Sequence, residues 1–160
     1  MWPFDPSLRF AKGQWCELCE TLHLKTQGAH ESGAFLLGTR RGRRRLVSRI
    51  IYYDELDPRA YASGVCILHA PAFAALWRRC EELRLEVVAD IHVHPSGAWQ
   101  STSDRENPMI AQKGHLALIL PDFARLPVRP SAIGFHEYLG RHQWRDLGGR
   151  WIAWRLNIGA

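Results

Sequence analysis

The chain has 160 residues, of which 46% are hydrophobic and 23% charged, and its formal net charge at pH 7 is +5. These values are typical of one globular domain with a proper core, and the charge favours acidic or nucleic-acid partners only mildly. No apolar run approaches the roughly 18 residues that a membrane span needs, and residues 1–6 lack the basic start and apolar stretch of a signal peptide. The four cysteines form no disulfide framework for a chain of this size, so we expect a reduced, cytoplasmic protein that makes no membrane contact.

The first predicted elements are an irregular arm and a helix. Residues 1–12 have prolines at positions 3 and 6 and predict the arm, after which residues 13–160 form a single domain. A helix is predicted over 13–26, because apolar side chains recur there at three- and four-residue steps and form one face. These side chains are Trp15, Leu18, Cys19 and Leu22.

A strand hairpin follows the helix. Residues 34–39 and 46–53 are apolar runs of strand length, and Gly42 lies between them at the expected turn. Five arginines surround this turn, namely Arg40, Arg41, Arg43, Arg44 and Arg45. They form either a solvated loop tip or a docking patch for an acidic surface or a phosphate backbone, such as that of a nucleic acid.

The middle of the chain predicts four further elements. They are a polar loop over 54–64, a strand over 65–69, a helix over 71–83 and a strand over 85–91. Pro71 suits the first turn of the helix. The last segment is short and rich in β-branched residues, which favours a buried strand over a helix.

The C-terminal part predicts one helix and four strands. Ser103 and Glu106 have the spacing of a capping box, whereas Asn107 followed by Pro108 is a competing helix start. From either start we expect the helix to reach about Lys113. The strands are expected over 115–121, 132–138, 143–146 and 151–157, with a loop over 122–130.

Residues 92–104 hold four polar side chains suited to metal-assisted hydrolysis. His92 and His94 share one face at the end of the buried strand, because side chains two apart in a strand point the same way. Two imidazoles on this spacing can converge on one zinc ion, and Pro95 then ends the strand. The following loop can bring Asp104 round as a third ligand, which leaves a fourth position for water, as in catalytic zinc sites. The alternative is two surface or hydrogen-bonded histidines at a strand end.

The pattern His-x-His-Pro, a loop and then Ser-x-x-Asp resembles the signature of the JAMM (MPN-plus, JAB) metallo-isopeptidase family. Glu31, with Gly38 seven residues later, is similar to the first-strand segment of that family, and residues 115–121 resemble the strand after the motif in bacterial members. The resemblance implies the α/β (α+β) class and the MPN/JAB, cytidine-deaminase-like fold, a mixed β-sheet curved into a partial barrel and flanked by helices. Residues 13–160 would then be one JAB/MPN-plus catalytic domain.

The resemblance also implies a site and a substrate. His92, His94 and Asp104 would hold one Zn²⁺ ion. Glu31 would be the general base, and Ser101 would donate a hydrogen bond to the oxyanion. The implied activity is hydrolysis of the amide after the C-terminus of a ubiquitin-like protein. Such a deubiquitinase-like protein would act beside the activating and conjugating enzymes of a bacterial ubiquitin-like conjugation or antiphage defence pathway.

The chain departs from the family pattern at two places. The loop between His94 and Ser101 holds six residues, where the family usually has seven, and Ala34 replaces a glycine. A non-catalytic MPN scaffold is one rival function, although the complete set of five polar site residues argues against it. A second rival is a RadC-like nucleic-acid-associated protein, because residues 94–97 resemble the corresponding motif of that branch. A third rival is a hydrolase that releases a small amine from a carrier protein. Asp90 is expected either to orient a metal ligand or to form an ion pair.

Overall fold

Strand β2 (Gly33–Arg41) lies at the centre of the computed structural model, which describes residues 5–159. It pairs antiparallel with β3 (Arg44–Tyr52) on one side and with β4 (Glu86–Val93) on the other. Its first six residues are buried, because side chains on both of its faces pack into apolar clusters. The pairing of β2 with β3 confirms the predicted hairpin and its turn at Gly42.

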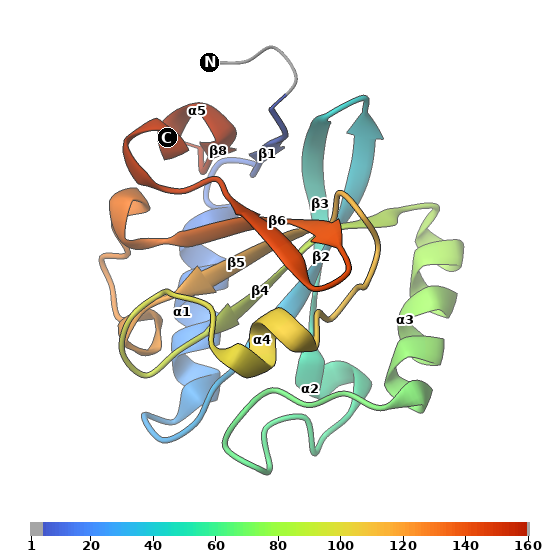
Figure 1. Ribbon diagram of the computed structural model, residues 1–160. Helices are drawn as coiled ribbons and strands as arrows, with labels where there is room; N and C mark the ends of the chain where they lie inside the picture. Colours follow the sequence, from blue (N-terminus) through green and yellow to red (C-terminus); the bar gives the residue numbers. More distant parts are fainter. Residues whose placement is uncertain (1–4, 160) are drawn as a thin grey trace.

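Within the described residues, eight strands form one mixed sheet that curls into a half-barrel flanked by helices (Figure 1). The order across the sheet is β7 (Gln143–Asp146), β6 (Gly134–Gly140), β5 (Leu116–Leu120), β4, β2, β3, β1 (Ser7–Arg9) and β8 (Leu156–Asn157). The pairs β4–β5, β1–β3 and β1–β8 are parallel, and the others are antiparallel. The predicted mixed α/β class is therefore confirmed.

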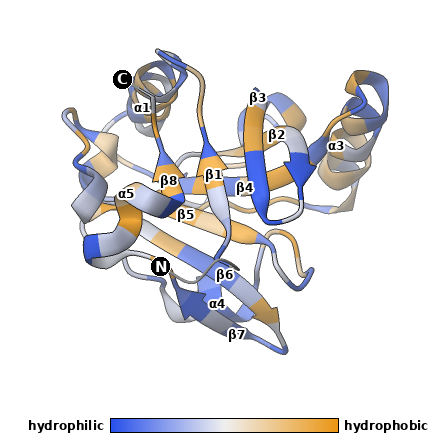
Figure 2. Cartoon of the chain, turned by 90° about the horizontal axis from the view of Figure 1, so that it is seen from above, coloured by the Kyte–Doolittle hydropathy of each residue, from blue (hydrophilic) through white to orange (hydrophobic). Residues whose placement is uncertain are grey.

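Helices cover both faces of this sheet. The predicted first helix is α1 (Gln14–Thr26), which packs Leu22 into the same apolar cluster as Leu36 of β2. The next long helix, α3 (Ala70–Leu83), packs against a second cluster that contains Phe35. Neighbouring residues of β2 thus contribute to different cores, because successive side chains of a strand point to opposite faces. Figure 2 shows hydrophobic segments along β1 and β5, and hydrophilic residues at the tip of the β2–β3 hairpin.

The remaining helical segments are short. They are α2 (Tyr53–Leu56), α4 (Thr102–Glu106), α5 (Ile152–Arg155) and the 3-10 turns η1 (Asp122–Ala124), η2 (Pro130–Ala132) and η3 (Gly149–Trp151). Between residues 5 and 159, no helix is both long enough and apolar enough to cross a membrane.

The N-terminal segment is part of the sheet rather than an irregular arm. Residues 7–9 form β1, which pairs with β3 and β8, and both Leu8 and Phe10 are buried. A strand of three residues has too few alternations to be recognised in a sequence. Residues 1–4 of the predicted arm lie outside the described residues.

Two predicted strands are wrong. Residues 65–69 pair with no strand in the described part of the chain, and the Cys66 N–H donates instead to the Glu31 carboxylate. Residues 151–157 form the end of η3, then α5 and the two-residue strand β8. In both segments the apolar residues suggested a strand, but a strand also needs a neighbour with free backbone groups.

The helix after the motif is shorter than expected. α4 begins after Ser101 and ends at Glu106, so the expected extension to about Lys113 is wrong. Asn107 is its C-cap, and Pro108 follows. A residue before proline is disfavoured in helical backbone, which explains the early end. Asp104 lies in the first turn, as the earlier of the two competing starts predicts, but the capping box is formed by Ser101 and Asp104 rather than by Ser103 and Glu106.

Most of the arginine cluster is bound within the chain. Arg45 is buried and donates to two backbone carbonyl groups. Arg43 pairs with Glu137 at 2.6 Å, and Arg40 pairs with Glu86 at 3.0 Å. The two remaining members, both exposed, are Arg41 and Arg44. The arginine cluster therefore binds the β2–β3 hairpin to neighbouring segments, and its exposed members add positive charge at the hairpin tip.

Leu8→Ala tests whether β1 belongs to the core. Because Leu8 is fully buried in the larger apolar cluster, we expect the free energy of unfolding to fall by about 2–5 kcal/mol. Urea denaturation measures this loss. Arg9→Ala, at an exposed position of the same strand, should change stability by less than about 0.5 kcal/mol. Equal urea midpoints for the two variants would show that this segment is not part of the core.

Candidate metal centre

The end of β4 places two imidazoles side by side. His92 and His94 lie on one face of the chain, as predicted, and each is 8% exposed. Their Nε2 atoms are 2.8 Å apart. Backbone bonds hold this strand end from both sides, because the Val93 N–H donates to Ser32 O and the His94 N–H donates to Leu120 O, each at 2.9 Å.

Helix α4 brings the third donor to the two imidazoles. Ser101 caps the helix, since its Oγ accepts the Asp104 N–H at 3.1 Å and its own N–H donates to Asp104 Oδ2 at 2.8 Å. This capping box turns the carboxylate back toward the strand. Oδ1 then lies 3.3 Å from Nε2 of His92, and Oδ2 lies 3.3 Å from Nε2 of His94.

These three side chains have the geometry of a metal site. A tetrahedral zinc ion with ligands at about 2.0–2.1 Å holds its donors about 3.3 Å from one another. The observed separations of 2.8, 3.3 and 3.3 Å are close to this value. Imidazole nitrogen and carboxylate oxygen suit several divalent ions. His92, His94 and Asp104 can therefore hold a divalent metal ion and would leave one tetrahedral position for water or substrate.

These contacts shift the pKa values of Asp104 and His92. Burial raises the pKa of Asp104, but the hydrogen bonds from His92 and His94 lower it by more. The pKa of Asp104 therefore lies well below its usual range. Burial lowers the pKa of His92, yet the hydrogen bond and charge of Asp104 outweigh this and raise it. The Asp104 carboxylate therefore stays ionised at neutral pH and can serve as an anionic ligand.

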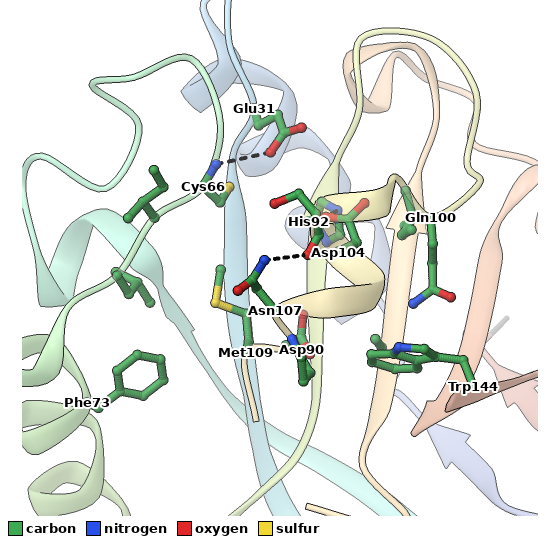
Figure 3. A pocket seen from close by; sticks show the side chains of 16 residues that line it. Glu31, Cys66, Phe73, Asp90, His92, Gln100, Asp104, Asn107, Met109 and Trp144 are labelled. Atoms are coloured by element: carbon green, nitrogen blue, oxygen red, sulfur yellow. Dashed lines mark hydrogen bonds and ion pairs between the residues drawn. The ribbon is translucent and has the colours of Figure 1, made fainter. Parts of the chain in front are cut away.

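Glu31 lies beside the three donors although it precedes the first of them, His92, by 61 residues in the sequence. Its Oε1 atom is 3.8 Å from Nε2 of His94, and its side chain is only 15% exposed. Its Oε2 atom accepts the Cys66 N–H at 3.0 Å, a bond that Figure 3 shows. One carboxylate oxygen is thus anchored while the other faces the donors, a placement that suits a general base.

The Ser101 hydroxyl is bound to a candidate metal ligand. It donates to Asp104 Oδ2 at 2.8 Å while it accepts the Asp104 N–H. In this arrangement the hydroxyl orients the Asp104 carboxylate. The oxyanion role expected from the sequence requires the hydroxyl to rotate away from Oδ2, while its bond from the Asp104 N–H remains.

Asp90 forms an ion pair, which is one of its two expected roles. Its Oδ1 atom is 2.6 Å from His115 Nε2, and its Oδ2 atom accepts the Tyr53 hydroxyl at 3.2 Å. All three side chains are buried, and burial raises the pKa of Tyr53 well above its usual value. Asp90 also lines the cavity beside His92, so this polar cluster forms part of its floor.

A cavity of about 420 Å³ opens beside the donors (Figure 3). Its apolar wall includes Ile67, Leu68, Phe73 and Met109. Gln100 and Trp144 also line the cavity, and sequence reasoning missed both. Gln100 lies in the motif loop, which could have drawn attention to it. Trp144 lies on β7, far from the motif in sequence, and no local pattern marks it.

Comparisons with known proteins give one relative named as a probable metalloprotease and two structures with a similar fold. No protein-family model matches the chain. It is 26% identical over 137 residues to a protein of Sinorhizobium fredii named "Probable metalloprotease y4jG", with 78% of each chain covered. The fold is similar to that of protein DSY2949 from Desulfitobacterium hafniense, with a TM-score of 0.62, 15% identity, and 94% and 93% of the two chains covered. A protein from Salinibacter ruber gives a TM-score of 0.51, 20% identity, and 86% and 87% coverage.

His94→Ala tests the donor set. The substitution removes one of three convergent donors, so we expect the purified protein to lose a divalent metal that the unaltered chain retains through dialysis. Elemental analysis measures the metal content. His142→Ala, at an exposed histidine outside the donor set, should leave it unchanged. Full metal content in His94→Ala would remove His94 from the site.

Proposed function

We propose that the chain is a zinc-dependent amide hydrolase of the JAMM (MPN-plus, JAB) type, with the corresponding MPN/JAB fold. The observation that carries this proposal is the Glu31 carboxylate beside a buried donor set of two histidines and one aspartate. The curled mixed sheet and the relative named as a probable metalloprotease support it. Zinc is the proposed metal because it favours tetrahedral nitrogen and oxygen ligands with one open position.

The side chains divide the chemistry among them. When bound, zinc lowers the pKa of a water molecule to about 7 and polarises the scissile carbonyl. Glu31 Oε1 accepts a proton from the attacking water and delivers it to the leaving amine. The bond from the Cys66 N–H to Oε2 keeps this base oriented. The Ser101 hydroxyl, released from Asp104, donates to the developing oxyanion.

In this proposal the acyl part of the substrate is the C-terminal tail of a ubiquitin-like protein, and the bond cleaved is an isopeptide or peptide bond after it. The cavity with the apolar wall suits a narrow, extended chain. Residues 65–69 pair with no strand within residues 5–159. The N–H groups of Cys66 and Ile67 are bonded to Glu31 and Ala60, so the remaining backbone groups, such as those of Leu68, are the ones available to a tail that adds as a strand. Activating and conjugating enzymes of a bacterial conjugation or antiphage defence pathway are the proposed partners.

Two rival functions have less support in the structure. A RadC-like nucleic-acid role was based on residues 94–97 and on the arginine cluster. Within that cluster, Arg45 is buried and both Arg40 and Arg43 are paired within the chain. A non-catalytic scaffold would not need a general base, yet Glu31 is anchored beside the donor set.

Glu31→Gln tests the assigned base. Because an amide cannot accept the proton, we expect hydrolysis to fall by about 10²–10⁴-fold while metal content is kept. The assay follows cleavage of a ubiquitin-like protein that carries an amide-linked C-terminal reporter, with and without a chelator. Glu82→Gln, at an exposed position on α3, is the matched control and should cleave at the native rate. Native activity in Glu31→Gln would show that Glu31 is not the base.

Ser101→Ala separates the two roles of its hydroxyl. At saturating zinc we expect kcat to fall by about 10²–10³-fold, because an oxyanion donor is lost. We also expect weaker zinc binding, by about 10-fold, because Asp104 loses an orienting bond. Kinetics over a range of buffered zinc concentrations measure both. A kcat that recovers fully at high zinc would restrict Ser101 to orienting Asp104.

A further inference from the structure

A second cavity, of about 440 Å³, adjoins the first one. Gln100 and Trp144 line both cavities, so they form the boundary between them. Figure 3 shows these two side chains on one side of His92 and Asp104, with Phe73 on the other side. The first cavity therefore runs beside the donors toward Phe73, and the second lies beyond Gln100 and Trp144.

Two polar groups meet on the floor of this second cavity. Gly134 has no room for a Cβ atom, because the Ala98 carbonyl oxygen packs against it. The same Cβ would lie 3.1 Å from Nε2 of His136, so both polar atoms lie next to this glycine. Among the described residues, the buried His136 Nε2 has no hydrogen-bond partner. No backbone or side-chain hydrogen bond in residues 5–159 uses the Ala98 carbonyl oxygen.

These two groups complement a peptide group. Burial lowers the pKa of His136 more than the Asp146 carboxylate raises it, so the ring is neutral at neutral pH and carries one proton. In the tautomer with the proton on Nε2, the cavity offers a donor beside the Ala98 acceptor. A peptide backbone carries one donor and one acceptor for each residue, and can satisfy both groups.

Two tryptophans form the walls above this floor. The Trp144 ring is held in place, because its N–H donates to Arg105 O at 3.1 Å and its ring centroid lies 4.9 Å from that of Tyr138. Trp99 is 68% exposed at the end of the motif loop. Large aromatic surfaces above a few polar groups are typical of sites that bind a peptide side chain and its backbone.

We propose that this second cavity binds the peptide segment on the amine side of the scissile amide, with a backbone N–H on Ala98 O and, after the His136 ring turns toward the cavity, a backbone C=O on its Nε2–H. The assignment to the amine side rests on the proposed function. The acyl tail then occupies the cavity with the apolar wall, and the two substituents of the amide leave the metal centre in different directions. The substrate class that follows is an amide with a peptide as leaving group, rather than one that releases a small amine.

Binding to this cavity can be measured without cleavage. The probe is acetyl-Ala-Lys-Ala-amide, titrated into the full chain as purified and followed by nitrogen-15 NMR. We expect saturable shifts of the Ala98 and Gly134 amides and of the Trp144 indole N–H. Trp99→Ala and His136→Leu should each weaken binding about tenfold, through the loss of a wall or of the only donor on the floor.

Controls exist on both the protein and the ligand. Trp154→Ala removes another exposed tryptophan, which is 66% exposed and does not line the cavity, and should bind the probe normally. A probe with N-methylated backbone amides cannot donate to Ala98 O and should bind about tenfold more weakly. The proposal is overturned if the unaltered chain shows no saturable shifts at millimolar probe. It is also overturned if Trp99→Ala binds the probe as tightly as the unaltered chain. Because Trp99 is exposed, we expect Trp99→Ala to fold, and it tests the proposal even if His136→Leu does not fold.

Kinetics separate this inference from the proposed function. Two substrates share one ubiquitin-like acyl part, and release either a peptide amine or ammonia. For Trp99→Ala we expect KM to rise about tenfold for the peptide leaving group and to stay unchanged for the substrate that releases ammonia. An equal change for both would overturn the assignment to the amine side. If the unaltered chain cleaves neither substrate, the proposed function fails, while the probe titration still decides whether the cavity binds peptide.

Discussion

The backbone pairing at the end of β4 is the constraint on which the candidate site depends. His92 is paired with Gly33 of β2, so Glu31, two residues before that glycine, lies beside His94. A slip of one residue would turn the side chains of β4 to the opposite face, and His92 would leave the cavity. The strand resists such a slip because it lies between β2 and β5 and is buried on both faces. The burial of this central strand therefore fixes the register that places His92 and His94 beside Glu31.

A strained turn reinforces this arrangement. The three residues of η1 have φ values of 51°, 54° and 55°, a left-handed conformation that costs roughly 1–2 kcal/mol for each L-residue. Two of its N–H groups hold the motif loop, from Phe123 to His94 O at 2.9 Å and from Asp122 to Ser96 O at 2.7 Å. His23 of α1 contacts Phe123 O at 2.7 Å from the other side. The strain therefore coincides with the bonds that position a candidate ligand, as is common at functional sites.

The two cavities make the candidate site asymmetric. Their sizes are similar, about 420 and 440 Å³, but their linings differ. The first has an apolar wall and an unpaired segment at 65–69, whereas the second has aromatic walls and two unsatisfied polar atoms on its floor. A symmetrical pair of pockets would hold a substrate in either orientation. Under the proposed function, the different linings of the two cavities favour one orientation of the substrate, with its carbonyl toward the metal ligands and its amine toward the second cavity.

The sequence by itself determined the elements whose signals are local. Residue spacing was enough to place the two histidines on one strand face and to identify α1, the β2–β3 hairpin and α3. It left two helix starts open after the motif, and the structure decided that Asp104 lies in the first turn of α4. Only the tertiary structure decided which segments found partners. Residues 7–9 became a strand and residues 65–69 did not, because a strand exists through the free backbone groups of its neighbours rather than through its own side chains. Likewise, nothing local distinguishes the buried Arg45 from its exposed neighbours, or brings Trp144 to the metal centre, since both depend on contacts between segments far apart in the chain.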